Sequence, residues 1–250
     1  MKLTRSLMRP LMKRIGQKLD YYSEFHPSSL SIQQYLDFGR AADQGASYKF
    51  LRKELLVRLA NIMKEINLLP SNLLQMQSAK LVQHWYQKSF LDLSVFENLP
   101  PNPDNFHKFN DAIGSVLQRH SKVVETMAEG LMELKTTHGV DVSTEKGLQY
   151  FLDRFYINRI SIRMLMNQHL LLFSNRLPES PRHVGAIDPT CDVVEIVNDA
   201  YENAKFLCDR YYLSSPGLKL ECKNAVDESL PISVCYVPSH LYHIMFELLK

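Results

Sequence analysis

Hydrophobic positions follow a helical period over most of the first two thirds of the chain. In the stretch from Ser47 to Leu69 they fall at positions 51, 55, 59, 62 and 66, the spacing of one helical face, and Pro70 ends the run. Comparable apolar stripes predict three further helices, which cover 78–99, 106–138 and a stretch that begins near 143. Amphipathic helices of this length bury their stripes most readily against one another, so the pattern predicts a four-helix bundle.

The pattern changes after a loop at 175–189, which contains several Pro and Gly residues and is the best candidate for a domain boundary. Asp192 and Glu195 have the spacing of a capping box and predict a helix that runs to about Tyr212. Alternation of apolar and polar residues then predicts strands at 218–222 and 232–236. Helix, strand, strand and a last helix are typical of the start of an α/β sandwich, although two strands do not form a stable layer by themselves.

The last helix begins after Pro238, with Ser239 as the expected N-cap, and no Gly, Asn or Pro ends it before Lys250. Because a free helix of about a dozen residues is marginal in water, we expect this one to continue or to pack on something outside the chain. The sequence is therefore interpreted as the front part of a longer protein. Its expected parts are a leader at 1–20, a helical bundle at 21–180 and the incomplete start of a second domain at 190–250.

Composition narrows the class of protein without changing this architecture. Of the 250 residues, 45% are apolar and 22% are charged, which is ordinary for a soluble globular protein. No apolar stretch approaches the roughly 20 residues that span a bilayer. The four cysteines lie far apart and form no C-x-x-C pair, so neither a zinc site nor a disulfide framework is indicated, and a reducing compartment fits best.

The net charge of +2 conceals a basic N-terminus. Six basic residues, the last of them Lys18, precede the first acidic residue, Asp20, so the remainder of the chain is mildly acidic. A general nucleic-acid surface is therefore not expected. The basic residues alternate with apolar ones at helical spacing, which is typical of an organelle transit peptide, and a basic first helix of the mature domain is the equally open alternative.

The last helix carries a candidate catalytic group. His240, His243 and Glu247 share one face of it. Three interpretations stay open: a solvated polar face, a general base with an orienting histidine, and a His-His-Glu metal site.

The helical part carries weaker candidates, each with a plainer alternative. His120 lies on the apolar stripe of the third predicted helix, and it is either a buried core histidine or a ligand-binding residue. Arg159 and Arg163, one turn apart, are either solvated or able to grip a small carboxylate. An apolar cluster near the start is either ordinary core or a hydrophobic docking pocket, and it consists of Leu30, Tyr35, Phe38 and Phe50. The chain contains no Walker loop, G-x-G-x-x-G, H-E-x-x-H or G-x-S-x-G motif, so any phosphate loop for a nucleotide is expected beyond Lys250.

Several stretches of the chain match one family closely. They are LSI at 30–32 with YLDFG at 35–39, VRLANIMKEINLLP at 57–70, QYFLDRFY at 149–156, RISIRML at 159–165 and YVPSHLYH at 236–243. Over about 20–250 the chain resembles the mitochondrial pyruvate dehydrogenase kinases and, more distantly, the branched-chain ketoacid dehydrogenase kinase. The resemblance implies an N-terminal helical bundle followed by an ATP-binding α/β sandwich like that of histidine kinases, of which this chain holds the truncated start.

The resemblance also implies an activity. Kinases of this family transfer phosphate from ATP, with Mg, to a serine of the decarboxylase component of the pyruvate dehydrogenase complex in the mitochondrial matrix, and thereby inactivate it. By this resemblance Glu247 is the base that takes the proton from the substrate serine, and His243 is its partner. The magnesium-binding Asn and the glycine-rich ATP boxes of the family are expected after Lys250. The chain alone is therefore expected to be inactive and to bind no cofactor tightly.

Two regulatory sites are implied by the same resemblance. Leu30, Tyr35, Phe38 and Phe50 match the pocket that receives the lipoyl group of the acetyltransferase core. The pocket for pyruvate-like inhibitory acids matches Leu59, Tyr86, Ser89, His120, Arg159, Ile162 and Arg163. Leu117 stands where close relatives carry a basic residue and Met166 replaces a branched aliphatic, which leaves the sensitivity to such acids open.

Two functions therefore remain to be separated. The first is the kinase, expected to be a homodimer in its full-length form. The second is a non-catalytic module that docks lipoyl domains and competes with the active kinase.

Overall fold

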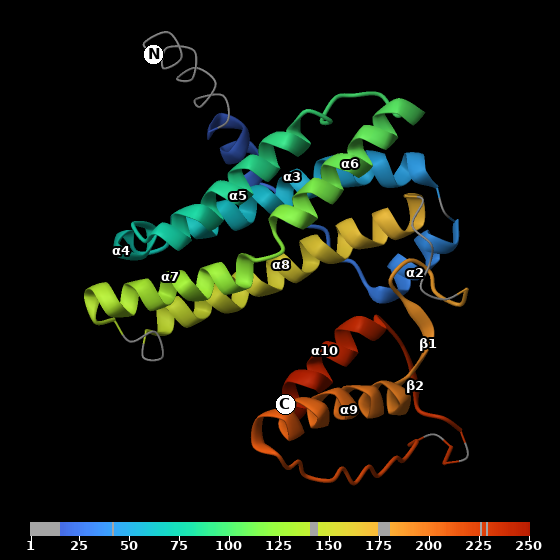
Figure 1. Ribbon diagram of the computed structural model, residues 1–250. Coiled ribbons are helices and arrows are strands. Elements are labelled where there is room, and N and C mark those ends of the chain that lie inside the picture. Colours follow the sequence, from blue (N-terminus) through green and yellow to red (C-terminus); the bar gives the residue numbers. More distant parts are fainter. Residues whose placement is uncertain (1–15, 42, 141–144, 175–180, 226, 229) are drawn as a thin grey trace. The chain divides into compact units, whose positions relative to one another are not determined.

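The computed structural model describes residues 16–41, 43–140, 145–174, 181–225, 227–228 and 230–250 (Figure 1). Apart from the gaps just given, these residues form two compact units, one of 16–29 with 43–174 and the other of 30–41 with 181–250. Most of the predicted basic leader, up to position 15, lies outside the described residues.

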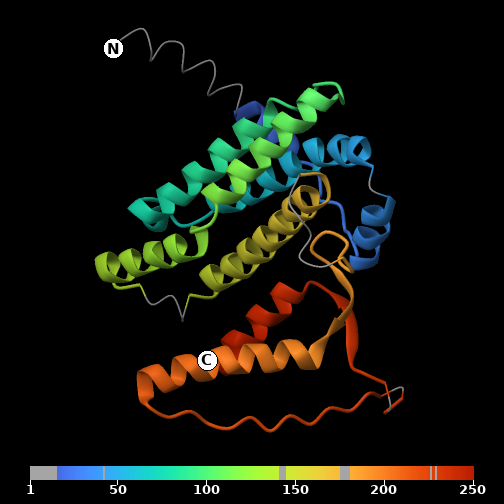
Figure 2. The same ribbon diagram turned by 45° about the vertical axis from the view of Figure 1, so that its right-hand side comes forward.

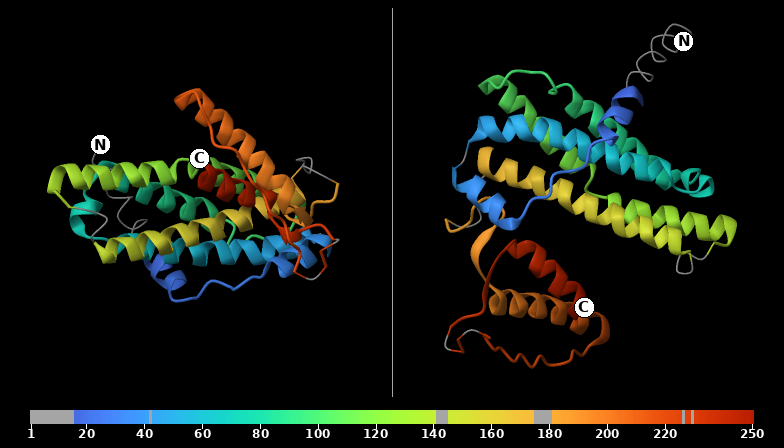
Figure 3. Two further views of the ribbon diagram at one scale, coloured as in Figure 1. Left: turned by 90° about the horizontal axis from the view of Figure 1, so that it is seen from below. Right: turned by 180° about the vertical axis from the view of Figure 1, so that it is seen from behind.

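The first unit is built from helices. After a helical stretch at 16–23 come α3 (Gln44–Asn67), α4 (Ser71–Leu74), α5 (Gln77–Ser94), α6 (Pro103–Arg119), α7 (Val123–His138) and α8 (Lys146–Phe173). α3 is the central element, since it packs against α5, α6 and α8. The long helices of this unit lie side by side in the views of Figures 1 and 3.

The core of the first unit is centred on α3. The predicted apolar stripe of this helix is confirmed, because each of its five residues is at most 2% exposed: Leu51, Leu55, Leu59, Ile62 and Ile66. Each such side chain contributes about 1.5–3 kcal/mol by leaving water. Since three helices cover α3, residues between the stripe positions, such as Leu56 and Met63, are buried as well.

The prediction of a single long third helix is wrong. α6 ends at Arg119, and α7 begins at Val123 after a turn in which His120 has φ −87° and ψ 7°. No Gly or Pro marks this break, and Val116 and Val123 on its two sides are both fully buried. The apolar period therefore runs across the turn, which hides it in the sequence. The helical character predicted for this part of the chain is confirmed.

α7 is fastened to the start of α5 by a polar and a steric contact. The hydroxyl of Ser78 donates to Glu133 Oε1 at 2.6 Å and its backbone N–H donates to Oε2 at 3.3 Å, so a side chain of α7 caps α5. Close by, a Cβ atom at Gly130 would lie 3.2 Å from the backbone nitrogen of Ala79. The crossing of the two helices thus depends on a residue without a side chain at this position.

The chain before the first long helix is also tied to the first unit. Lys18 forms an ion pair with Glu97, and the hydroxyl of Tyr22 donates to Glu97 Oε1 at 2.6 Å. Tyr22 is only 7% exposed. Lys18, at the end of the predicted leader, therefore takes part in the folded unit.

The second unit contains α2 (Ile32–Ala41), β1 (Asp188–Asp192), α9 (Val193–Tyr212), β2 (Ser233–Tyr236) and α10 (Pro238–Leu249). The strands β1 and β2 are antiparallel, with Cys191 opposite Val234 and Asp192 opposite Ser233. α10 packs along α9, as Figure 2 shows. Together with the first unit, the chain is mostly helical with one small two-stranded sheet among its described residues.

Two predictions in the second unit are confirmed. Asp192 caps α9, since its side chain accepts from the backbone N–H groups of Val194 and Glu195, and the helix ends at Tyr212 as predicted. The second predicted strand corresponds to β2. Both signals, the cap at Asp192 and the alternation at 232–236, come from neighbouring residues, so they can be recognised without knowledge of the tertiary packing.

Two other predictions in this unit are wrong. Residues 218–222 form no strand: they alternate in polarity but have no partner strand, and Lys219 pairs with Glu221 in solvent. The partner of β2 is β1. This strand begins with Asp188 and Pro189, which are typical of loops, so the sequence pattern predicted a loop at its start. Ser239 is not the cap of α10, because Val237 holds the cap position and Pro238 occupies the first turn.

Among the described residues, no helix is both long enough and apolar enough to cross a membrane.

Candidate functional site

Three polar side chains meet inside the first unit, from α5 and from the turn between α6 and α7. Ser89 Oγ lies 2.9 Å from His120 Nε2, within hydrogen-bond distance, and the serine hydroxyl donates to the carbonyl of Trp85 at 2.8 Å. The ring of Tyr86 lies 4.4 Å from that of His120, centroid to centroid. All three side chains are at most 1% exposed. The break between α6 and α7 is thus what brings His120 to this site.

Two arginines of α8 complete the site. Arg159 is 8% exposed, and Arg163 lies one turn further along the helix. Within the described part of the chain, Nη1 of each arginine is buried without a hydrogen-bond partner, and so is the hydroxyl of Tyr86. Neither guanidinium forms an ion pair with a carboxylate of the described residues. The site therefore holds two cations and three unused polar atoms.

Burial determines the charge state of these groups. It lowers the pKa of the Arg159 guanidinium, and it raises the pKa of the Tyr86 hydroxyl against the opposing effect of both arginines. Burial also lowers the pKa of His120 to about 4, with a further contribution from Arg159, Arg119 and Arg163. At neutral pH the histidine is uncharged and both arginines are charged, so the site is positive.

This arrangement suits a small carboxylic acid. A guanidinium offers parallel N–H donors that match the two oxygens of a carboxylate, and a buried cation without a counter-charge gains most from an anion. Apolar groups adjoin these residues: the ring of Phe155 lies 5.8 Å from that of Tyr86, and Ile162, between the two arginines on α8, is fully buried, as is Leu59 of α3. We call the set of Leu59, Tyr86, Ser89, His120, Arg159, Ile162 and Arg163 the acid site.

The sequence did not point to Arg119. Its Nη1 donates to Ser89 Oγ at 2.7 Å and its Nη2 to Asp92 Oδ2 at 2.6 Å. A continuous third helix would have placed Arg119 on a different face from His120, and only the turn brings both to α5. In the sequence, the signal that could have indicated partners for Arg119 is the spacing of Ser89 and Asp92, which lie one turn apart on α5. Of the two positions that leave the sensitivity to acids open, Met166 is fully buried and Leu117 is half-buried.

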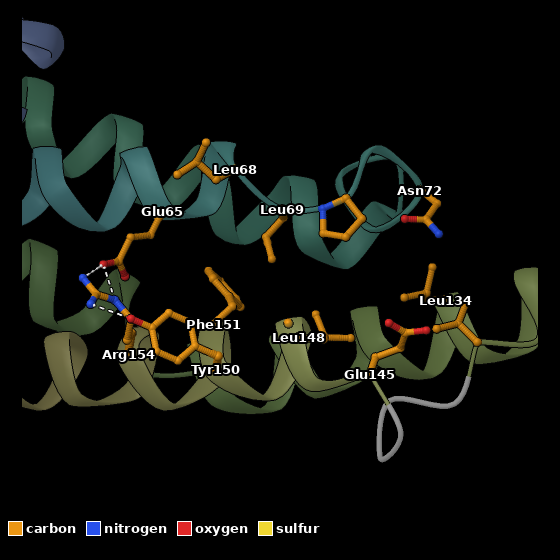
Figure 4. A pocket seen from close by; sticks show the side chains of 13 residues that line it. Glu65, Leu68, Leu69, Asn72, Leu134, Glu145, Leu148, Tyr150, Phe151 and Arg154 are labelled. Carbon is orange, nitrogen blue, oxygen red and sulfur yellow. Dashed lines mark hydrogen bonds and ion pairs between the residues drawn. The ribbon is translucent and has the colours of Figure 1, made fainter.

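A separate cavity of about 660 Å³ lies at the end of the first unit, lined by residues of α3, α7, α8 and the loops beside them (Figure 4). Its wall is largely apolar and includes Leu69, Leu148 and Phe151. At its edge Arg154 pairs with Glu65, with Nε 2.9 Å from Oε1. None of the predicted site residues lines this cavity, and its arginine already has an anionic partner.

The predicted catalytic pair lies on α10 in the second unit. His243 and Glu247 are exposed, and among the described residues no hydrogen bond joins them. Glu247 instead pairs with Lys250, whose Nζ lies 2.9 Å from Oε2. The metal-site interpretation of this helix is wrong, since the described residues contain no group of three or more His, Cys, Asp or Glu placed to hold a metal.

The predicted docking cluster is divided between the units. Phe50 belongs to α3 and is 39% exposed. Leu30 precedes α2, and Tyr35 and Phe38 lie within it, with Phe38 36% exposed. Partly exposed aromatic side chains are available for contact with another molecule. That these four residues form one pocket stays a prediction.

Comparison with known proteins assigns the family. The sequence model of the family described as "Mitochondrial branched-chain alpha-ketoacid dehydrogenase kinase" matches residues 29–188. The chain belongs to this kinase family. The match covers α2 to α8 and ends at the first residue of β1, so it includes all residues of the acid site.

Curated relatives of this kinase family agree. The chain is 63% identical over 250 residues to the "Probable [pyruvate dehydrogenase (acetyl-transferring)] kinase, mitochondrial" of Caenorhabditis elegans, covering 100% of this chain and 62% of the relative. It is 62% identical over 248 residues to the corresponding kinase of Ascaris suum, covering 99% and 62%. Isozyme 3 of Homo sapiens is 53% identical over 248 residues, covering 98% and 61%. The resemblance found in the sequence is confirmed, and the chain spans less than two thirds of each of these relatives.

Proposed function

We propose that the protein is an ATP-dependent serine kinase of the mitochondrial matrix that phosphorylates and inactivates the decarboxylase component of the pyruvate dehydrogenase complex. Its membership of the kinase family carries this proposal, and the names of its curated relatives support it. In this proposal the first unit is a regulatory four-helix bundle in which α6 and α7 together take the third place. Residues 190–250 of the second unit are the start of the ATP-binding α/β sandwich of the histidine-kinase type, whereas α2 belongs with the bundle at 21–180.

Catalysis in this proposal depends on α10. Glu247 accepts the proton of the substrate serine, and His243, one turn earlier on α10, is its partner. The exposure of Glu247 supports this role, because a substrate hydroxyl can reach it once the ion pair with Lys250 opens. ATP supplies the phosphoryl group and Mg neutralises its charge, so that catalysis is mainly positioning and electrostatics.

Regulation in this proposal acts through the acid site. A pyruvate-like acid binds with its carboxylate on Arg159 and Arg163 and with the Tyr86 hydroxyl as a further donor. The buried, unpartnered atoms of these three residues support this assignment, because a bound carboxylate is the group that satisfies all of them. Recruitment to the complex acts through the lipoyl group of the acetyltransferase on Leu30, Tyr35, Phe38 and Phe50, and the full-length kinase is a homodimer.

A phosphate-transfer assay tests the proposed activity. The full-length protein, incubated with labelled ATP, Mg and the decarboxylase component, is expected to label that component on serine and to lower its activity, whereas this chain alone is expected to be inactive. Replacing the proposed base by Glu247→Gln should lower kcat by roughly 10²–10⁴-fold, while pyruvate binding to the first unit stays unchanged. Serine labelling that is equally fast with Glu247→Gln would remove the base assignment. Absence of labelling by the full-length protein would contradict the kinase itself.

A further inference from the structure

Arg119 is a third arginine beside the acid site, and it differs from the two on α8 because it has a carboxylate partner. Its Nη2 lies 2.6 Å from Asp92 Oδ2, and its Nη1 donates to Ser89 Oγ at 2.7 Å. The side chain of Arg119 is 14% exposed and that of Asp92 is 38% exposed. The charge of Arg119 is therefore balanced by a carboxylate that stays in contact with solvent.

A second carboxylate acts on the acid site from a greater distance. Glu125 lies in the first turn of α7 and is exposed. Burial lowers the pKa of the Arg159 guanidinium, and the negative charge of Glu125 is one of the effects that oppose this. The charge of Glu125 therefore reaches Arg159, although the two side chains form no ion pair among the described residues.

Most of the charge around the acid site is thus compensated. The arginines at 119, 159 and 163 carry three positive charges. Burial is the main cause that lowers the pKa of His120, and the charges of all three arginines add to this effect, so they act at one place. The carboxylates at 92 and 125 carry two negative charges. Together these five side chains leave one net positive charge.

One net positive charge favours a ligand that carries one negative charge. A guanidinium matches the oxygens of a phosphate as well as those of a carboxylate, so the two arginines of α8 alone do not distinguish these ligands. A dianion loses more hydration on entering a buried site than a monoanion does, and here no net positive charge remains to offset its second negative charge. The surrounding carboxylates are therefore able to decide which anion binds.

We propose that Asp92 and Glu125 determine the specificity of the acid site, which they make selective for small monocarboxylates over dicarboxylates and phosphate dianion. This inference rests on the acid binding at Arg159 and Arg163 proposed above. Neither carboxylate contacts the bound acid. Each one opposes the binding of any anion, and its effect on the binding free energy is twice as large for a dianion as for a monoanion.

Calorimetry with pyruvate, malonate and inorganic phosphate tests the inference at about pH 8, where malonate and phosphate are mainly dianions. The native protein should bind pyruvate more tightly than either dianion. Asp92→Asn keeps a side-chain oxygen for Arg119 but removes the charge, so it should raise the affinity for malonate relative to pyruvate roughly 2- to 5-fold. Glu125→Gln should have a similar effect, and the double variant should raise this ratio roughly 4- to 25-fold.

Asp111→Asn is the matched control, because it makes the same change in net charge on an exposed carboxylate of α6. Asp111 lies about 12 Å along the helix from Arg119, so salt screens its charge from the acid site. The control should leave the ratio of the two affinities unchanged. Asp92→Glu keeps the charge and should retain the selectivity of the native protein.

The ratio of affinities separates specificity from structural damage, since damage to the site weakens the binding of all three anions alike. The inference is overturned if the native protein binds malonate or phosphate as tightly as pyruvate, or if the double variant keeps the native ratio. It is also overturned if Asp111→Asn changes the ratio as much as Asp92→Asn does. If Asp92→Asn unfolds early, Glu125→Gln provides the independent variant. Failure of the native protein to bind pyruvate would instead overturn the proposed acid binding.

Discussion

Arg154 and Arg159, on neighbouring turns of α8, lie in opposite environments. The side chain of Arg154 is 52% exposed and pairs with Glu65 at the edge of the end cavity, whereas Arg159 is 8% exposed, forms no ion pair among the described residues, and has an Nη1 atom without a hydrogen-bond partner. An exposed ion pair adds little to stability, and a buried cation without a partner lowers it. An arginine is therefore informative about binding where the fold leaves a hydrogen-bond donor of its guanidinium without a partner. This contrast supports the proposed binding of an acid at Arg159.

The largest expected effect comes from removing the unpaired charge. Arg159→Met should weaken pyruvate binding by roughly 10- to 150-fold, because a hydrogen bond to a charged group contributes about 1.5–3 kcal/mol. The free variant should melt no lower than the native protein, since an apolar side chain takes the place of an unpaired buried charge. Thermal melts with and without pyruvate check both statements. Undiminished stabilisation by pyruvate would show that the acid binds elsewhere.

The next effect concerns pH. Burial lowers the pKa of His120 and of His169 from 6.5 to about 4. The unfolded chain binds protons at these sites in that range and the folded chain does not, so stability rises with pH from 4 to 6.5 and is complete above it. Each histidine contributes about 3 kcal/mol to this dependence. Urea unfolding at a series of pH values measures it, and a flat profile between pH 4 and 6.5 would contradict the prediction.

The two buried histidines also provide a test that distinguishes the acid site from the rest of the core. His169 is bonded to Ser47 Oγ at 2.7 Å and Asn110 Oδ1 at 2.9 Å, and burial alone lowers its pKa. His120 faces Tyr86 and three arginines, at 119, 159 and 163. A bound carboxylate offsets those positive charges, so pyruvate should raise the pKa of His120 and leave that of His169 unchanged. Titration of both imidazoles by NMR distinguishes them, and equal shifts would count against a specific acid site.

A smaller effect is expected at Tyr86. Its hydroxyl is buried without a partner, so Tyr86→Phe should leave the free protein as stable or make it more stable. Pyruvate affinity should fall roughly 2- to 10-fold, the contribution of one neutral hydrogen bond. Calorimetry with pyruvate measures the loss. A destabilised free protein would show that the hydroxyl has a partner, which would remove it from the set of unused donors.

The smallest effect is expected at the paired arginine. Arg154→Gln should cost at most about 1 kcal/mol, because its pairing with Glu65 is largely exposed. It should not change pyruvate affinity, which makes it the matched control for Arg159→Met on the same helix. Chemical unfolding and pyruvate titration of both variants complete the comparison. A loss of pyruvate binding in Arg154→Gln as large as that in Arg159→Met would erase the distinction between the two sites.

Much of the fold was predictable because its signals are local. The buried stripe of α3, the cap of α9 at Asp192 and the strand that ends at Tyr236 each depend on a few neighbouring residues. The turn at His120 was not predictable, since the apolar period continues through it without a Gly or Pro. The pairing of β1 with β2 was missed for a related reason: a short strand that begins with Asp-Pro has no signal of its own until its partner is in place.

The amino-acid sequence alone establishes the residue types of the acid site, and the family resemblance predicts that these residues belong to one site. Tertiary structure decided their states. Only packing shows that Nη1 of Arg159 and of Arg163 lacks a hydrogen-bond partner, that His120 is uncharged, and that Arg119 reaches Ser89. The physical reason is that burial and partner distance set the charge and hydrogen bonding of a polar group, and both depend on helices far apart in the chain.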